Sequence, residues 1–114
     1  MVDFCQIYNM DFSFLYITAK NREEAGKIGK ILVAERLVAC VNIIDGMESI
    51  YWWENKIQEE RETVLIAKTS KTRVPAVIEK VKSVHSYQVP CIIELPILSG
   101  NPDYLRWIGE ETVS

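Results

Sequence analysis

Residues 37–69 read LVACVNIIDGMESIYWWENKIQEERETVLIAKT, and this stretch decides the fold. It begins and ends in runs of apolar and β-branched residues, which are typical of strands. Between these runs, Asn55-Lys56 predicts a hairpin turn, because Asn tolerates the left-handed backbone conformation. Asp45-Gly46 predicts a turn, or a bulge inside one longer strand. We therefore expect one long β-hairpin whose tip projects from the rest of the sheet.

Before the hairpin, the chain predicts a strand and then a helix. Residues 14–19 form a short apolar run with the composition of a buried strand. Asn21 is a helix N-cap, and the apolar residues Ala25, Ile28 and Leu32 recur at helical spacing up to about Arg36. Residues 1–12 show no clear period, so we assign them to an N-terminal extension and residues 13–114 to a single domain.

After the hairpin, the chain predicts a helix, a strand and a last helix. Thr72 is the candidate cap of the helix whose apolar stripe is formed by Val74, Val77, Ile78 and Val81. A strand follows over residues 91–95, with prolines on both sides that belong at a strand end or a sheet edge. Asn101-Pro102-Asp103 starts the last helix, and its expected inner face is formed by Tyr104, Trp107 and Ile108.

The order βαββαβ plus a terminal helix predicts an α+β protein with a four-stranded antiparallel sheet and two helices on one face. The long central β-hairpin is longer than the other strands of a 114-residue protein can cover. Its projecting part therefore has unpaired strand edges, which favour oligomerisation. We therefore expect copies of the chain to associate.

Composition narrows the class of protein. The chain is 48% hydrophobic and has a formal net charge of -3, with no basic block, which argues against nucleic acid and anionic membranes as partners. No apolar run approaches the roughly 18 residues of a membrane-spanning helix. Three cysteines without a CxxC pair favour reduced thiols and a cytoplasmic location.

Thiol and imidazole side chains are the candidate metal ligands. Cys40 and His85 come first and Cys91 third, and this combination suits copper(I), with zinc as the alternative. His85 is the only histidine, so one chain has no two-histidine site. Alternatively, Cys40 is a small buried hydrophobe and His85 stabilises the end of a helix. No cofactor is expected to be needed for folding.

Four motifs together resemble the CutA divalent-cation-tolerance family. They are the strand 37–44 with its L-x-A-C-x-N pattern, the aromatic block 49–54, Lys68-Thr69 with the segment 85–90, and the closing helix 100–108. The likeness covers about residues 14–110. It implies a ferredoxin-like sandwich and a homotrimer in which long hairpins reach neighbouring subunits. The resemblance also implies a role in tolerance to divalent cations and the binding of a metal ion, either a divalent ion or cuprous copper.

The same resemblance leaves a second function open. The family shares its trimer plan with PII-type signalling proteins, so the alternative is a signalling or scaffold module that binds a small ligand or a partner protein between subunits. Three positions depart from the family pattern: Ser86 stands where many members have proline, Asn55 where glycine is common, and Cys91 where some members have an acidic residue. A site built on that carboxylate would change in kind.

Adjacent aromatic residues predict a subunit interface or the wall of a cleft. Tyr51, Trp52 and Trp53 follow one another in a strand, so at least one ring points away from the core. Exposed aromatics mark interfaces, although packing of the hairpin on a helix is the alternative. Lys68 and Tyr87 match family positions and are expected in the same cleft, unless Lys68 is simply an edge-strand charge.

No catalytic constellation accompanies these residues. There is one histidine, no nucleophile motif beside a base, and no phosphate-binding glycine loop, so we predict that the protein is not an enzyme. The acidic stretch 58–62 is interpreted as a solvated face of the hairpin, with weak binding of divalent ions as the minor alternative.

Overall fold

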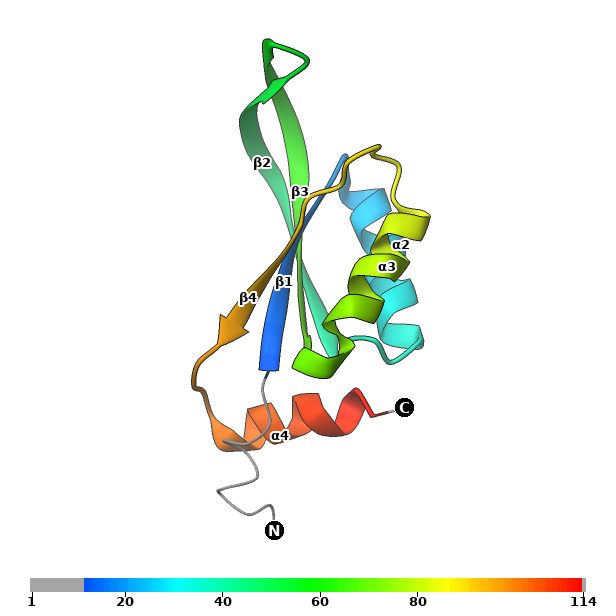
Figure 1. Cartoon of the computed structure of the whole chain (residues 1–114), viewed down its shortest axis with the longest axis vertical. Helices are drawn as coiled ribbons and strands as arrows, with labels where there is room; N and C mark the ends of the chain where they lie inside the picture. The colour runs from blue at the N-terminus through cyan, green and yellow to red at the C-terminus, as the bar shows by residue number, and fades with distance from the viewer. Residues whose placement is uncertain (1–11, 114) are drawn as a thin grey trace.

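A computed structural model describes residues 12–113 and contains one four-stranded sheet (Figure 1). The strands are β1 (Phe12–Ala19), β2 (Cys40–Trp53), β3 (Lys56–Ser70) and β4 (Ile92–Ile97), arranged in the order β2-β3-β1-β4. Every neighbouring pair is antiparallel. The helices are α2 (Arg22–Ala34), α3 (Val74–Val84) and α4 (Pro102–Glu111), and a 3-10 turn, η1 (Lys71–Arg73), precedes α3. The βαββαβ sandwich with its C-terminal helix is confirmed.

Two helices cover one face of the sheet. α2 and α3 lie side by side against it, while α4 crosses the lower end of the molecule (Figure 1). Alternate residues of the two central strands point toward the helices, as the two-residue period of a strand requires. The main core is formed by Leu15, Ile17, Ile28, Leu32, Val38, Leu65, Ala67, Val74, Val77 and Val81. The apolar stripes predicted for α2 and α3 are therefore confirmed.

Helix caps agree with the sequence at two places and differ at a third. Asn21 accepts the backbone N–H of Glu24 at 2.9 Å, and Asn101 accepts that of Asp103 at 3.0 Å. The predicted Thr72 cap is wrong, because residue 72 lies inside η1 and Arg73 precedes α3 without a side-chain cap. The 3-10 turn brings the chain from β3 into α3 instead.

The inner face predicted for the last helix is partly wrong. Ile108 is fully buried, but Leu105 is its partner, in a small cluster with Phe12 at the end of the sheet. Tyr104 and Trp107 remain exposed, and their tilted rings pack against each other with centroids 5.5 Å apart. α4 packs against the end of the sheet rather than against its face. The side of the helix that is buried therefore differs from the predicted one.

The hairpin turn lies one residue earlier than predicted. Glu54 and Asn55 both have positive φ, at 50° and 62°, and Lys56 already begins β3. Two consecutive left-handed residues match the twist of a two-residue hairpin loop. Strand bounds also shift: β1 begins at Phe12, and β4 extends through Pro96, which the edge position of β4 tolerates. The predicted extension otherwise lies outside the described residues, as does Cys5.

Asp45-Gly46 forms the bulge. Ile44 pairs with Val64 and Met47 with Glu62, so three steps along β2 match two steps along β3. Gly46 has φ +80°, a conformation that suits glycine, and Asp45 accepts both its N–H and the hydroxyl of Thr63. One extra residue reverses the alternation of side chains, so odd-numbered residues of β2 beyond the bulge share the face of even-numbered residues before it.

Neither α2 nor α3 covers the second face of the sheet, and α4 reaches only its lower end (Figure 1). The cross-strand register puts apolar side chains on this uncovered sheet face: Phe14, Tyr16, Ile44, Ile66, Ile93 and Leu95. Ile44 and Ile93 are each 54% exposed, and Leu95 is 38% exposed. An apolar face of this kind is usual inside an interface rather than on a monomer surface.

Candidate functional site: a cleft under the hairpin

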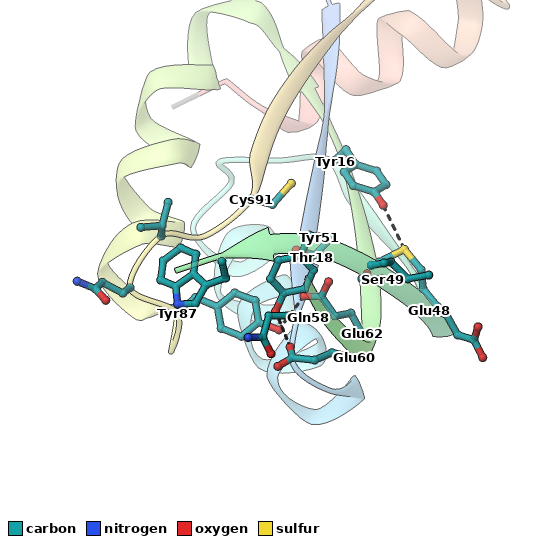
Figure 2. Close-up of a pocket in the computed structure, with 15 residues that line it drawn as sticks. Tyr16, Thr18, Glu48, Ser49, Tyr51, Gln58, Glu60, Glu62, Tyr87 and Cys91 are labelled. Atoms are coloured by element: carbon teal, nitrogen blue, oxygen red, sulfur yellow. Dashed lines mark hydrogen bonds between the residues drawn. The ribbon is translucent and has the colours of Figure 1, made fainter. Parts of the chain in front are cut away.

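A cleft with a volume of about 780 Å³ lies on the uncovered sheet face, where the hairpin projects beyond the end of β1. Its walls come from the outer half of the hairpin, from β1 and from the loop between α3 and β4 (Figure 2). We call it the hairpin cleft. Its lining residues are Tyr16, Thr18, Met47, Glu48, Ser49, Ile50, Tyr51, Trp53, Gln58, Glu60, Glu62, Tyr87, Gln88, Val89 and Cys91.

The bulge selects which aromatic residues of the hairpin reach the cleft. Tyr51 pairs with Gln58 and Trp53 with Lys56, on the side of β2 that faces the cleft. Trp52 alternates to the other side, where it is 71% exposed. Without the extra residue at the bulge, the alternation would place Trp52 in the cleft and remove its two neighbours.

Two tyrosines donate hydrogen bonds to carboxylates inside the cleft. The Tyr87 hydroxyl donates to Glu62 at 2.7 Å, and the Tyr51 hydroxyl donates to Glu60 at 2.9 Å (Figure 2). Burial and the bond to Glu62 raise the pKa of Tyr87, while the bond to Glu60 raises the pKa of Tyr51. Both phenols therefore stay neutral at physiological pH, and the charge of the cleft resides on its glutamates.

Sulfur atoms stand on opposite walls of the same cleft. Cys91 lies next to β1, where its carbonyl accepts the N–H of Thr18 at 3.4 Å. Burial raises the pKa of the Cys91 thiol, so the thiol is protonated at neutral pH and a metal ion would have to displace that proton. The Met47 thioether accepts the hydroxyl of Tyr16 at 3.2 Å (Figure 2).

His85 lies behind the cleft with both ring nitrogens engaged. Its Nε2 is 2.7 Å from the carbonyl oxygen of Thr18, and its Nδ1 accepts the N–H of Tyr87 at 3.0 Å. With Nδ1 as the acceptor, Nε2 is the ring nitrogen that donates to Thr18. The imidazole is fully buried, and its bonds join β1 to the loop that carries Tyr87 and Cys91. Metal binding at His85 would have to break one of these bonds.

Cys40 and Lys68 lie at the opposite end of the uncovered sheet face. The hydroxyl of Tyr104 is 3.5 Å from Cys40 Sγ and accepts Lys68 Nζ at 3.2 Å. Cys40 pairs with Lys68 across the sheet, and Lys68 pairs with Phe14 of β1. Phe14 lies four residues before Thr18. Four residues of strand span about 13 Å, so Cys40 and the cleft thiol are well separated within one copy.

The cleft thus gathers four of the eight residues singled out from the sequence: Tyr51, Trp53, Tyr87 and Cys91. His85 supports it from behind, and the other three lie elsewhere. Sequence reasoning missed Glu60 and Glu62, which it interpreted as part of a solvated face. Their two-residue spacing with Gln58 was the available signal, since residues at i, i+2 and i+4 share a strand face.

Within residues 12–113, no three His, Cys, Asp or Glu side chains are grouped closely enough to hold a metal ion. The helices of this part of the chain also include none that is both long and apolar enough to cross a membrane.

Comparison with known proteins agrees with this architecture. Residues 13–111 match the family model described as CutA1 divalent ion tolerance protein. The chain is 47% identical over 96 residues to the divalent-cation tolerance protein CutA of Thermus thermophilus, covering 84% of this chain and 93% of that one. It is 44% identical over 98 residues to the chloroplastic protein CutA 1 of rice, covering 86% of this chain.

The chain spans only 55% of the length of that rice relative. The crystal structure of CutA1 from rice superposes with a TM-score of 0.88 at 42% identity, covering 90% of this chain and 94% of the other. Both the sequence over nearly all of residues 13–111 and the ferredoxin-like fold are therefore shared. The chain belongs to the CutA1 divalent ion tolerance protein family.

Proposed function

We propose that the protein is a homotrimeric, copper-binding divalent-cation tolerance protein that acts by binding and not by catalysis. Family membership supports the tolerance role, since the family is described by ion tolerance and not by a reaction. We place the protein in the cytoplasm, because three cysteines without a CxxC pair favour reduced thiols. The observation that carries the assembly is the uncovered sheet face.

Association would bury the apolar surface that one copy leaves open. The sheet face exposes Ile44, Ile93 and Leu95, and the hairpin extends the molecule to 53 Å against 25 and 22 Å in the other directions. The radius of gyration is 15.3 Å, whereas a compact domain of about 100 residues has about 13 Å. Neighbouring copies would cover both the face and the projecting ribbon, and the family resemblance favours three of them.

For the metal, we propose Cys91 as the principal ligand. Its thiol and the Met47 thioether line one cleft, and soft sulfur donors select copper(I). One copy supplies no group of three donors among the described residues, so donors from a second copy are part of the proposal. His85 and Cys40 remain the other two proposed ligands, although their contacts inside one copy favour structural roles.

Copper(I) titration under reducing, anaerobic conditions with a colorimetric competitor tests this site. Cys91→Ser should weaken copper binding by at least about tenfold, because oxygen is a poor substitute for thiolate toward copper(I). Cys40→Ser should weaken copper binding less than Cys91→Ser does, because Cys40 lies at the far end of the sheet within one copy. The copper proposal fails if neither substitution nor His85→Gln changes the affinity.

A second candidate function is that of a PII-like module that binds a small ligand. The hairpin cleft favours it, because 780 Å³ lies within the usual size range of small-molecule sites and is far larger than a bare ion needs. A thermal-shift screen of small molecules in the presence of a metal chelator tests this function. A stabilising compound whose effect survives Cys91→Ser would support it, and a screen with no stabilising compound would oppose it.

A further inference from the structure

Glu62 is a buried carboxylate without a counter-ion. Its side chain lines the hairpin cleft, yet the residue is only 8% exposed. No salt bridge within residues 12–113 involves it, and its Oε2 accepts a single hydrogen bond, from Tyr87. Buried charges in proteins are normally paired, so an unpaired carboxylate facing a cavity indicates a site for a cation.

The second oxygen of Glu62 is available to a ligand. Oε1 accepts no hydrogen bond from the described residues, and no fully buried polar side-chain atom among them lacks a partner. Oε1 is therefore reached by solvent. Because Tyr87 holds the other oxygen, the carboxylate is fixed in orientation before any ligand arrives.

The walls around Glu62 also favour a positive ligand. Glu60 lines the same cleft on the strand face of Glu62, and the lining includes no Lys or Arg from the described part of the chain. Four aromatic residues, Tyr16, Tyr51, Trp53 and Tyr87, complete the walls. The faces of aromatic rings attract cations, and they do so more strongly when the cation is desolvated.

We propose that the hairpin cleft binds a small organic ammonium ion, whose N–H groups donate to Glu62 while its carbon atoms contact the aromatic walls. A metal ion does not use aromatic walls, and an anion such as a nucleotide would meet two glutamates, Glu60 and Glu62. This proposal rests on the small-ligand function above and names its ligand class; it is independent of copper binding at Cys91.

Isothermal titration with three probes tests the charge selectivity, with a chelator present and the assembly kept intact. The probes are 1,4-diaminobutane, its uncharged analogue 1,4-butanediol, and ATP. We expect saturable binding of the diamine alone. Binding of ATP in preference to the diamine would overturn the proposal while leaving a small-ligand function standing. Equal binding of diamine and diol would overturn it as well, because charge would then be irrelevant.

Substitutions then place the bound cation. Glu62→Gln keeps the size of the side chain and an acceptor for Tyr87 but removes the charge, so diamine affinity should fall at least about tenfold. Glu59→Gln is the matched control, because it removes the same charge from the same strand on the face turned away from the cleft. Equal losses in both variants would indicate nonspecific attraction and refute the site.

Glu60→Gln provides a second test in case the buried Glu62→Gln substitution impairs folding. Glu60 is exposed, so its substitution should leave the melting temperature unchanged while still weakening the diamine. If Glu60→Gln and a correctly folded Glu62→Gln both bind the diamine like the parent protein, the ammonium site does not exist. That result would leave the copper proposal untouched, because copper binding is measured in a separate titration of the same variants. The two proposals can therefore fail separately.

Discussion

At the scale of single residues, one remote carboxylate helps to position the cleft. Glu24 Oε2 accepts the N–H of Ser86 at 2.9 Å, and its Oε1 accepts the N–H of Lys20 at 3.2 Å. These bonds join the β1–α2 connection to the loop that His85 also holds, and that loop carries Tyr87 and Cys91. The backbone N–H groups of both loops thereby gain acceptors that they would otherwise seek in water.

Glu24 should make stability fall in acid. Burial alone raises its pKa, but hydrogen bonds from Ser86 and Lys20 outweigh this, so the pKa lies below the ordinary value of 4.5. The folded protein therefore binds this proton less readily than the unfolded chain, and the stabilisation is present above pH 4.5 and lost below it.

The measurement is the melting temperature of Glu24→Gln between about pH 6 and pH 3. The variant should melt lower than the parent at pH 6 and lose less on acidification, because glutamine does not titrate. Glu23→Gln, an exposed substitution in the same helical turn, should keep the parent slope. An unchanged slope in Glu24→Gln would show that this carboxylate does not couple folding to pH.

At the scale of elements, the close packing of α2 on the hairpin depends on a glycine. Gly29 is buried in α2, and a Cβ at this position would come within 2.8 Å of Val41 Cγ2. Gly26 lies one turn earlier, and a Cβ at that position would have no atom within 4 Å. Glycine weakens a helix at both positions, but only at Gly29 does it allow close approach to β2.

Substitution of these two glycines by alanine should therefore have opposite effects. Gly29→Ala should destabilise the protein by about 1–3 kcal/mol through overpacking. Gly26→Ala should stabilise it by about 0.5–1 kcal/mol through helix propensity. Thermal or denaturant unfolding at a fixed protein concentration measures both. A shift of the same sign in the two variants would contradict the packing argument.

At the scale of the whole molecule, the hairpin cleft and the apolar surface are parts of one sheet face. Tyr16 belongs to both, with Ile93 beside it on β4. The cleft therefore opens next to the surface that we propose is covered by other copies. Occupancy of the cleft and association of subunits are expected to influence each other for this reason.

Leu95→Glu should dissociate the assembly. A charge on the uncovered sheet face would lose its water on association without gaining a partner, which costs several kcal/mol. Light scattering should report a monomer with an unchanged circular dichroism spectrum. Val33→Glu is the control, since Val33 is also about 40% exposed but lies on α2, away from this face. A Leu95→Glu protein of unchanged mass would place the interface elsewhere.

Local pattern was sufficient to predict the order and type of every regular element except η1. Helix caps such as Asn21, the apolar stripe of α3 and the strand runs are short-range signals, and they need no knowledge of distant contacts. The turn at Glu54 and the start of β1 were misplaced by one or two residues, because element ends depend on pairing partners. Family resemblance added the expectation of a trimer.

The sequence by itself therefore determined a βαββαβ chain with an overlong ribbon and named residues on both walls of its cleft. Only the tertiary structure decided that Trp53 rather than Trp52 faces that cleft, and that Glu62 is buried against Tyr87. The reason is physical: one extra residue at Gly46 reverses every side chain of β2 beyond it, and the burial of Glu62 depends on a loop 25 residues later in the chain.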